Sequence, residues 1–328
     1  MMRAALYSRN GPAREVLELT ELPAPAPGPG EVRVKLAVSG VNPSDVKSRA
    51  GSRPVTSGYV VPHSDGAGVI DQVGDGVPPE RIGQRVWVWN GQWQRPMGTA
   101  AQYIALPAEQ AVALPDAVSF EAGACMGIPG LTAMQAVIVA GDMEGKTVLV
   151  TGGASGVGYY AAQMARLAGA RVIATVGSRE KAGVLEQVGV TDAVFYKDEP
   201  VAERLLALTG GRGVDAIIDM DFSTTAPLVT AGAVAPHGTV VVYGSNYRGD
   251  IPVNFGAWLP RSISLHFFLV YDLLPAQRHH AVSRLGGLLA ADKLRHLIAP
   301  AYALDEIAAA HEAVESGRIL GNVVVAIP

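Results

Sequence analysis

The chain of 328 residues contains a single cysteine, Cys125, and this scarcity limits both its cross-links and its metal chemistry. One cysteine excludes an internal disulfide framework and every zinc site built from several cysteines. Because Cys125 stands in an apolar run, we expect it to pack in the core as a small hydrophobic side chain. The chain must then be stabilised by burying apolar surface, and its 49% hydrophobic content allows a large core.

Charge is also scarce, at 17% of residues, and its balance argues against a polyanionic partner. The formal net charge is −4, and no window collects Lys and Arg into a basic cluster. Nucleic-acid binding is therefore not expected as the main role, since phosphates require a positive excess. The N-terminus has no apolar segment typical of a secretory signal, and the uncharged stretch 122–141 contains Pro129 and four glycines. We expect a buried loop and helix there, no membrane span, and a cytoplasmic protein.

The first 120 residues contain apolar, strand-like runs that glycine and proline interrupt at short intervals. This pattern predicts a β-rich domain. The expected strands cover 32–38, 68–73, 85–89 and 101–106.

From about residue 125 to 262 the pattern changes to alternating strands and helices. The strands have near-continuous Val and Ile content, which is typical of strands buried on both faces. Such alternation predicts a doubly wound parallel sheet, and hence an α/β fold class. The expected strands are 146–150, 171–176, 193–196, 214–219 and 238–243, and the expected helices are 159–168, 181–188 and 201–209. The tail holds a strand-like 263–270, helices at 275–292 and 305–316, and a last strand at 322–327 that returns to the first domain.

A glycine-rich turn, Thr151 to Gly158, follows the first of these strands and opens a helix. Glycines allow the backbone to approach a pyrophosphate, and a helix N-terminus offers unpaired N–H groups and a positive dipole end. The strict G-x-G-x-x-G pattern is not met, because Ser155 takes the middle position between Gly153 and Gly158. The context predicts dinucleotide binding, and a purely structural turn stays open as the alternative.

The end of the second strand of this region favours NADPH as the cofactor. An NAD site places an acidic residue there, to accept from the ribose 2′-OH. Here the strand ends in Gly177, Ser178 and Arg179, followed by Lys181, and these can hold a 2′-phosphate. A merely solvated helix start is the alternative.

The chain resembles the zinc-free quinone oxidoreductase branch of the medium-chain dehydrogenase/reductases, the zeta-crystallin-like proteins. The matching motifs cover nearly the whole length in the expected order. They are Gly40-Val-Asn-Pro-Ser-Asp45, Asp65-Gly-Ala-Gly-Val-Ile70, Gly127-Ile-Pro-Gly-Leu-Thr-Ala133, Val148 to Gly158, Thr209 to Asp215, Tyr243-Gly-Ser245 and Ala310-His-Glu312.

This resemblance implies a GroES-like β-barrel domain that carries the substrate and a Rossmann domain that binds NADPH. We expect the barrel domain from 1–124 and 264–328, and the Rossmann domain from 125–263. The family resemblance also implies a cofactor in a cleft between the domains and a homodimer. The apolar run 263–270 is the edge through which we expect the copies to pair.

No metal is expected. The zinc-dependent alcohol dehydrogenases of the superfamily place Cys near Ser44 and a His-Glu pair near His63, but here His63 is followed by Ser64. A catalytic zinc needs about three side-chain ligands, and the sequence does not offer them at these positions.

The resemblance assigns the candidate catalytic residues. Asn42 matches the family's Asn, which contacts substrate or cofactor, and its alternative role is that of a turn residue before Pro43. Thr132 matches a cleft Thr that contacts the cofactor, with a helix cap as the alternative. Lys47 stands where many relatives carry Tyr, which puts a Tyr proton donor in doubt and leaves Lys47 as a charge, a donor or a solvated side chain.

The cofactor contacts carry over in the same way. The expected set shares positions along the pyrophosphate turn, the 2′-phosphate region, the adenosine and the nicotinamide. It comprises Asn42, Thr132, Gly153, Ala154, Ser155, Gly156, Val157, Gly158, Gly177, Ser178, Arg179, Lys181, Tyr196, Gly244, Ser245, Phe267, Phe268, Leu269 and Asn322.

Three functions remain open at this stage. The first is NADPH-dependent hydride transfer to quinones, with no metal and mainly by positioning. The second is reduction of C=C bonds in enones or enoyl thioesters, and the third is a non-catalytic NADPH-binding protein. Trp87, Trp89 and Trp93 fall within seven residues and serve either as core or as a stacking wall for an aromatic acceptor.

Overall fold

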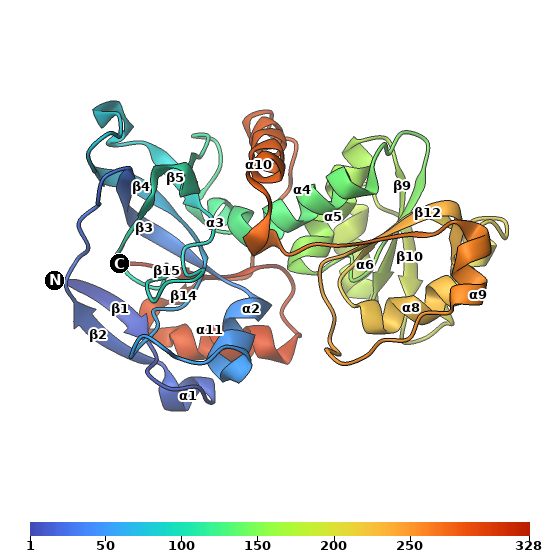
Figure 1. Ribbon diagram of the computed structural model, residues 1–328, viewed down its shortest axis with the longest axis horizontal. Coiled ribbons are helices and arrows are strands. Elements are labelled where there is room, and N and C mark those ends of the chain that lie inside the picture. The colour runs from blue at the N-terminus through green and yellow to red at the C-terminus, as the bar shows by residue number, and fades with distance from the viewer. The chain divides into compact units, whose positions relative to one another are not determined.

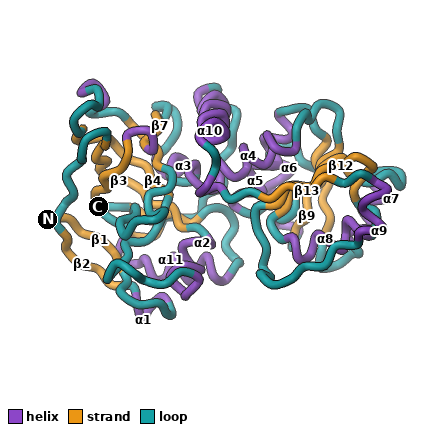
Figure 2. Tube along the Cα trace, in the orientation of Figure 1, coloured by secondary structure: helices purple, strands orange, loops and turns teal.

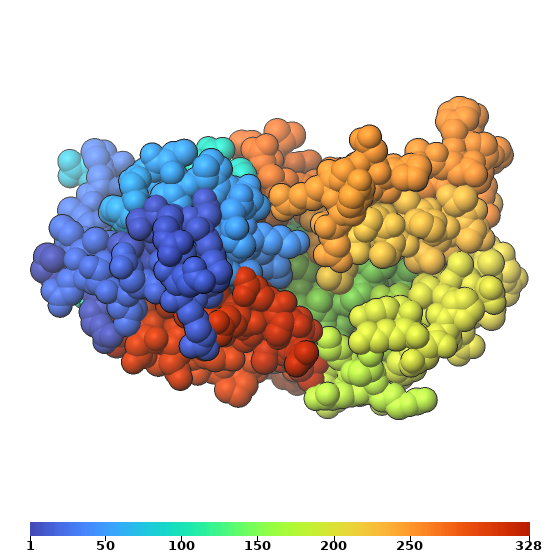
Figure 3. All heavy atoms as spheres, turned by 90° about the horizontal axis from the view of Figure 1, so that it is seen from below, coloured from blue at the N-terminus to red at the C-terminus, as the bar shows by residue number.

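The computed structural model describes all 328 residues, which form two compact units. The first unit combines Met1–Pro129 with Gly286–Pro328, and the second comprises Gly130–Leu285. Figure 3 shows the C-terminal residues packed beside the N-terminal ones within the first unit. This return is fixed by strand pairing, because β15 (Val323–Ala326) lies antiparallel to β3 (Glu31–Val41).

The unit boundaries differ from the expected domain boundaries at 124 and 263. The stretch 264–285 lies in the second unit, because β13 (Ser264–Phe267) pairs in parallel with β12 (Val234–Val242) and extends its sheet. The later boundary falls inside helix α10 (Pro275–Ala290). Strand β13 is also shorter than the expected 263–270, since a 3₁₀ turn begins at Val270.

The first unit is built on a seven-stranded sheet in the order β14-β15-β3-β4-β5-β7, with β6 paired to β3. Along β3, Val32, Val34 and Leu36 alternate with more exposed residues and enter the core, as a half-buried strand requires. A separate two-stranded antiparallel sheet, β1–β2, and short helices complete the unit (Figure 1). Its other elements are β1 (Met2–Leu6), α1 (Ala13–Val16), β2 (Glu18–Leu22), α2 (Pro43–Lys47), the π-helical η1 (Ser48–Ser52), β4 (Asp65–Val73), β5 (Arg85–Val88), β6 (Tyr103–Pro107), β7 (Ala111–Ala113), α3 (Phe120–Gly123), η4 (Met126–Gly130), β14 (Tyr302–Ala303) and α11 (Ile307–Ser316).

The second unit contains a six-stranded, all-parallel sheet in the order β10-β9-β8-β11-β12-β13, which confirms the doubly wound arrangement. Its central strands are inaccessible on both faces, because helices pack against the sheet (Figure 2). Its remaining elements are α4 (Leu131–Ala140), β8 (Thr147–Val150), α5 (Gly156–Leu167), β9 (Arg171–Val176), α6 (Arg179–Glu186), β10 (Asp192–Phe195), α7 (Val201–Leu208), β11 (Val214–Asp219), α8 (Phe222–Thr230) and α9 (Phe255–Trp258).

Helix α8 is absent from the sequence-based expectations. Its Ser-Thr-Thr run and the internal Pro227 are typical of a loop, yet Phe222, Ala226 and Val229 line one face and are buried in the core. Burial of this face outweighs the weak helix propensity. No helix is long and apolar enough to cross a membrane.

Candidate active site

Asp65 is the buried centre of the polar residues in the first unit. It begins β4 opposite Gly40 of β3, and its side chain is fully buried. Oδ2 accepts hydrogen bonds from Asn42 Nδ2 at 2.9 Å and from the backbone N of Ile128 at 3.0 Å, while Oδ1 has no partner. Burial raises the pKa of Asp65 well above its ordinary value, because desolvation disfavours the charged form.

The glycines around Asp65 allow this close packing. A Cβ on Gly127 would lie 2.3 Å from Asp65 Oδ1, and a Cβ on Gly40 would lie 2.2 Å from the carbonyl oxygen of Ala124. Gly127 therefore lies directly against the carboxyl group and Gly40 lies against the backbone of Ala124, and neither position has room for a Cβ. Two of the motifs that carry the family resemblance therefore have a steric reason.

Asn42 is held inside this cluster. It precedes α2 and is 5% exposed. Its backbone N–H donates to Asp45 Oδ2 at 2.8 Å, and its side-chain amide donates to Asp65. Both of the roles considered for Asn42 are therefore compatible with its position, but at least one amide hydrogen is committed to the fold.

Lys47 lies at the other end of the same helix and is exposed. Asp45, in the middle, is buried, and desolvation raises its pKa to about 7 against the hydrogen bonds from Asn42. The α2 segment thus combines a buried, weakly acidic carboxyl group with a solvated ammonium group.

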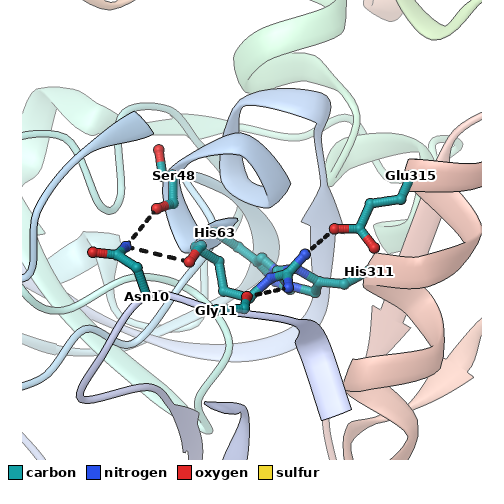
Figure 4. A network of polar contacts seen from close by, with 7 residues as sticks. Asn10, Gly11, Ser48, His63, His311 and Glu315 are labelled. Carbon is teal, nitrogen blue, oxygen red and sulfur yellow. Dashed lines mark hydrogen bonds and ion pairs between the residues drawn. The ribbon is translucent and has the colours of Figure 1, made fainter. Parts of the chain in front are cut away.

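A second buried network lies behind Asp65 and includes two histidines (Figure 4). His63 Nε2 lies 2.9 Å from His311 Nε2, and His63 Nδ1 lies 2.8 Å from Ser39 Oγ. Ser39 Oγ lies 2.8 Å from Thr99 Oγ1, which donates to the backbone oxygen of Asp65. Burial lowers the pKa of both histidines, to about 3 for His311, where the charge of Arg49 adds to the effect. Both imidazoles are therefore neutral near pH 7.

The proton order in this network follows from donor counting. Thr99 gives its only hydroxyl proton to the carbonyl of Asp65, so Ser39 donates to Thr99 and His63 Nδ1–H donates to Ser39. A neutral His63 then accepts at Nε2 from His311 Nε2–H. This leaves His311 Nδ1 as a buried acceptor without a partner.

The buried guanidinium of Arg49 lies near His311 and connects helix α11 to the η1 segment. Its guanidinium is 1% exposed, pairs with Glu315 of α11 and donates to the carbonyl of Gly11 at 2.6 Å, while its Nε has no partner. Helix α11 is therefore tied by Glu315 and His311 to the two segments that hold Asn42 and Asp65.

In the second unit, the predicted glycine turn connects β8 to α5 as expected. Gly152 has φ of +61°, and its N–H donates to Thr175 Oγ1 at 2.8 Å. A Cβ on Gly153 would lie 2.6 Å from Ala174 Cβ, and one on Gly158 would lie 2.2 Å from the carbonyl oxygen of Gly152. These glycines bring the turn, helix α5 and strand β9 close together.

The turn leaves N–H groups for a ligand. Ser155 caps α5 by accepting from Gly158 N at 3.1 Å, and Gly153 N donates to the carbonyl of Thr175. The N–H groups of Ala154, Gly156 and Val157 make none of these bonds, and they lie at the positive end of a 12-residue helix. This set fits a pyrophosphate.

The end of β9 carries no acidic side chain. Ser178 caps α6 by accepting from Lys181 N at 3.3 Å, and the Arg179 guanidinium lies 5.2 Å from the ring centre of Phe195. Tyr196 is 51% exposed and its ring borders Gly177. Lys197, which the sequence reasoning missed, places its ammonium 6.0 Å from that ring.

Two acidic residues at the end of β11 were also missed. Asp219 is fully buried and accepts at Oδ1 from Thr151 and Thr225, and burial raises its pKa to about 6. Asp221 accepts from the backbone and side chain of Asn246 at 2.9 and 2.8 Å. Burial opposes ionisation of Asp221, but its hydrogen bonds outweigh it and the pKa is lowered. An acidic residue directly after an apolar parallel strand is the signal that could have indicated them.

Asp221 thereby holds the turn after β12. Ser245 Oγ lies 3.4 Å from it, and a Cβ on Gly244 would lie 2.7 Å from the carbonyl oxygen of Met220. The predicted positions Gly244 and Ser245 thus occupy a turn fixed from the end of the neighbouring strand.

The remaining predicted residues divide between the units. Thr132 is buried in the first turn of α4, and Phe267 and Leu269 are exposed, with Phe268 half-buried. Asn322 lies in the first unit, where its amide donates to the carbonyl of Leu297 at 3.3 Å. Its side chain therefore already has a partner within the fold.

The structure shows where the three tryptophans and the single cysteine lie. Trp87 is fully buried and Trp89 is 8% exposed, so both belong to the core, whereas Trp93 is half-buried. Cys125 packs in the core as expected. No group of three or more His, Cys, Asp or Glu side chains could hold a metal ion.

Comparison with known proteins assigns both units. Residues 28–116 match the alcohol dehydrogenase GroES-like domain, and residues 156–285 match the zinc-binding dehydrogenase domain. These two domains in this order define the medium-chain dehydrogenase/reductase fold.

Individual relatives identify the family within the medium-chain dehydrogenase/reductases to which the chain belongs. A quinone oxidoreductase of Pseudomonas aeruginosa is 32% identical over 328 residues, covering 98% of each chain. A quinone oxidoreductase structure from Pseudomonas syringae pv. tomato is 30% identical, with a TM-score of 0.86 over 100% of both chains. Mycobacterial Rv1454c, solved in complex with NADPH, is 28% identical, also with a TM-score of 0.86 over 100% of both chains. The chain belongs to the quinone oxidoreductase family of the medium-chain dehydrogenase/reductases and is an oxidoreductase.

The glycine packing predicts the effect of added methyl groups. We expect Gly158→Ala to lower the free energy of unfolding by about 1–3 kcal/mol, because its Cβ meets backbone rather than a flexible side chain. Gly183→Ala on α6, where nothing lies within 4 Å, is the matched control and should raise stability by about 0.5–1 kcal/mol. Thermal unfolding measures both, and equal effects would contradict the packing argument. Titration with a nicotinamide cofactor should also show weaker binding for Gly158→Ala alone.

The raised pKa of buried Asp45 predicts that the stability of the protein depends on pH. Its pKa is about 7 in the folded chain against an ordinary 3.8, so the folded chain retains a proton that the unfolded chain has lost. The associated stability is complete below about pH 4 and is lost as the pH rises through 7. Asp45→Asn does not titrate, so its unfolding free energy relative to wild type should improve by about 1 kcal/mol or more between pH 5 and pH 8. Urea unfolding measures this, with exposed Asp75→Asn as control, and a pH-independent difference for Asp45→Asn would refute it.

Proposed function

We propose that this oxidoreductase uses NADPH to reduce quinones without a metal ion. The observation that carries the proposal is the β8–α5 turn, whose N–H groups fit a pyrophosphate, together with the acid-free end of β9. The names of the relatives support the quinone as acceptor. Enones are the second acceptor class to be compared.

Hydride from nicotinamide C4 is the chemistry that bound NADPH supplies. The quinone takes up this hydride and one proton and leaves as hydroquinone, with NADP⁺ as the other product. The residues of the chain then have to orient and hold the reactants. Asn42, fixed by Asp65 and Asp45, and buried Thr132 are the groups we assign to this task.

Proton delivery places little demand on the chain. The oxygen of a reduced quinone is protonated readily by solvent, and exposed Lys47 can assist as a nearby cation. Metal independence is supported by the donor set, since the chain has one cysteine and no cluster of three ligands. Electron-poor acceptors are suited to such a site, because they do not require Lewis-acid activation.

The preference for NADPH over NADH is supported by charge. Arg179, Lys181 and Lys197 follow the ends of β9 and β10, and no acidic residue occupies the position that binds a ribose 2′-OH in NAD sites. A 2′-phosphate would find charge-assisted donors there. One structural relative was solved with NADPH, which supports the choice.

A panel of quinones and enones with both cofactors tests the function. We expect NADPH oxidation with quinones, and an affinity for NADPH about tenfold or more above that for NADH, from one charge-assisted phosphate contact. Arg179→Gln should reduce this preference, and exposed Arg212→Gln in the same unit should not. Turnover of enones but not quinones would favour the second acceptor class. Tight NADPH binding without turnover of either would favour a non-catalytic protein.

We also propose that the chain forms a homodimer through β13. This strand is the edge of the six-stranded sheet, and Phe255, Phe267 and Leu269 beside it are 72, 63 and 49% exposed. An unpaired apolar edge favours pairing with a second copy. Light scattering at micromolar concentration should give twice the chain mass of 34.1 kDa. Ser264→Lys on β13 should shift the mass toward one chain, whereas exposed Gln187→Lys should not; a monomeric wild type would overturn the proposal.

A further inference from the structure

The side-chain amide of Asn42 has a donor end, Nδ2, and an acceptor end, Oδ1, and the fold determines which end a reactant meets. The backbone that carries the amide is fixed. Asn42 is extended, with φ of −113° and ψ of 157°, as the following Pro43 favours. Its N–H donates to Asp45 Oδ2 at 2.8 Å. The amide therefore starts from one defined position.

The donor end of the amide is directed at two buried carboxyl groups. Asn42 Nδ2 donates to Asp65 Oδ2 at 2.9 Å. Burial raises the pKa of Asp45, and hydrogen bonds from the backbone and the side chain of Asn42 oppose this rise. The two hydrogens of the amide are thus used within the fold, since Asp45 is 5% exposed and Asp65 has no exposed surface.

The direction of the Asn42–Asp65 hydrogen bond does not depend on the protonation of Asp65. Oδ2 also accepts from the backbone N–H of Ile128 at 3.0 Å. An oxygen that accepts from two donors is not the one that carries a proton, so a proton on this carboxyl group lies on Oδ1, beside Gly127. Asn42 must turn its NH₂ group toward Oδ2 in both cases.

The carboxyl group that imposes this direction is itself held in place. Asp65 pairs with Gly40 at the start of β4, and its backbone oxygen accepts from Thr99 Oγ1. Gly127 packs against its Oδ1, where a Cβ would lie at 2.3 Å. Rotation of the carboxyl group would break the bonds from Asn42 and Ile128 together, with no water at hand to replace them.

We infer that Asp65 is a positioning residue that turns Asn42 Oδ1 toward the reactants, so that Asn42 binds a hydrogen-bond donor, a hydroxyl or an amide N–H. Such an oxygen has two lone pairs and no proton, and it does not bind the carbonyl oxygen of a quinone. This inference rests on the proposed function, in which Asn42 contacts the reactants, and specifies the group it holds. The donor has two sources: the nicotinamide nucleoside of the cofactor, with its carboxamide and ribose hydroxyls, and the hydroxyls of the hydroquinone product.

The test measures, by calorimetry, the affinity of the wild type for pairs of probes that differ in one donor. The cofactor arm compares NADPH with its 3-acetylpyridine analogue, which lacks the amide N–H, and with analogues that each lack one hydroxyl of the nicotinamide ribose. The product arm compares 1,4-naphthohydroquinone, kept free of oxygen, with 1,4-dimethoxynaphthalene. We expect the loss of the donor to weaken binding about fivefold or more in at least one arm, which identifies the source.

Variants test whether Asp65 is responsible for this discrimination. Asp65→Val keeps about the same volume but accepts no hydrogen bond, so the Asn42 amide can turn and the discrimination should fall below about twofold. Asp65→Asn can still offer an oxygen to Asn42 and Ile128, and should restore it. A merely structural role of Asp65 would instead change both affinities of a probe pair equally.

The controls separate folding from recognition. Exposed Asp75→Asn in the same unit should bind every probe as the wild type does. Thermal unfolding without ligand shows whether each variant is folded. If Asp65→Val does not fold, Asn42→Leu replaces it, because leucine resembles the amide in shape but has no acceptor and should equally abolish the discrimination.

The outcomes distinguish this inference from the proposed function. Failure of the wild type to oxidise NADPH with quinones would remove the proposed function, whereas the affinities are measured without turnover. No discrimination by the wild type in either arm, or discrimination that persists in Asp65→Val or Asn42→Leu, would overturn the inference and leave the quinone reductase in place. Discrimination that is lost in Asp65→Val, or in the Asn42→Leu variant that replaces it, and retained in Asp65→Asn would establish it.

Discussion

The first unit depends on one buried carboxyl group. Asp65 has no access to solvent, and removing a carboxyl group from water is costly unless hydrogen bonds or protonation compensate. The fold provides hydrogen bonds from Asn42 and the backbone of Ile128, and burial raises the pKa of the group. Strand β4, helix α2 and the η4 segment meet at this carboxyl group. The hydrogen bonds that it accepts therefore fix the positions of all three relative to one another. The absence of a side chain at Gly127, which lies against this carboxyl group, follows from the same requirement.

In the second unit the main structural constraint is on the β8–α5 turn, whose backbone N–H groups are arranged so that they can bind an anion. Its glycines remove side chains where the turn, helix α5 and strand β9 approach one another most closely. Thr151, Thr175 and Asp219 then bind the turn's backbone and side chains, so that the free N–H groups keep fixed directions. Preorganised donors of this kind bind an anion without an entropic penalty for ordering the loop.

The parallel sheet could be predicted because strand burial leaves a continuous apolar signal, and the limits of 171–176 and 214–219 agree with β9 and β11. Helix α8 could not, since its stability comes from packing of Phe222 and Val229 rather than from its polar, proline-containing sequence. The second unit extends beyond the expected boundary at 263 for a similar reason: only pairing with β12 shows that β13 belongs to the parallel sheet. Motifs indicated Asn42 and the glycine turn. They included Asp65 and His311 but did not indicate the buried contacts of these residues, because such contacts join residues far apart in sequence, 248 positions apart for His63 and His311. Asp221 was not indicated by any motif.

The burial of Cys125 has a chemical consequence for the proposed reduction of quinones. Quinones are electrophiles that alkylate accessible thiolates, and a thiolate must be both formed and exposed to react. Cys125 is 2% exposed, its Sγ donates to the carbonyl of Glu121 at 3.2 Å, and burial raises its pKa well above the ordinary value. As it is the only cysteine in the chain, the protein offers no reactive sulfur to its own proposed substrate. Resistance to self-inactivation would then follow directly from the composition and the packing of the core.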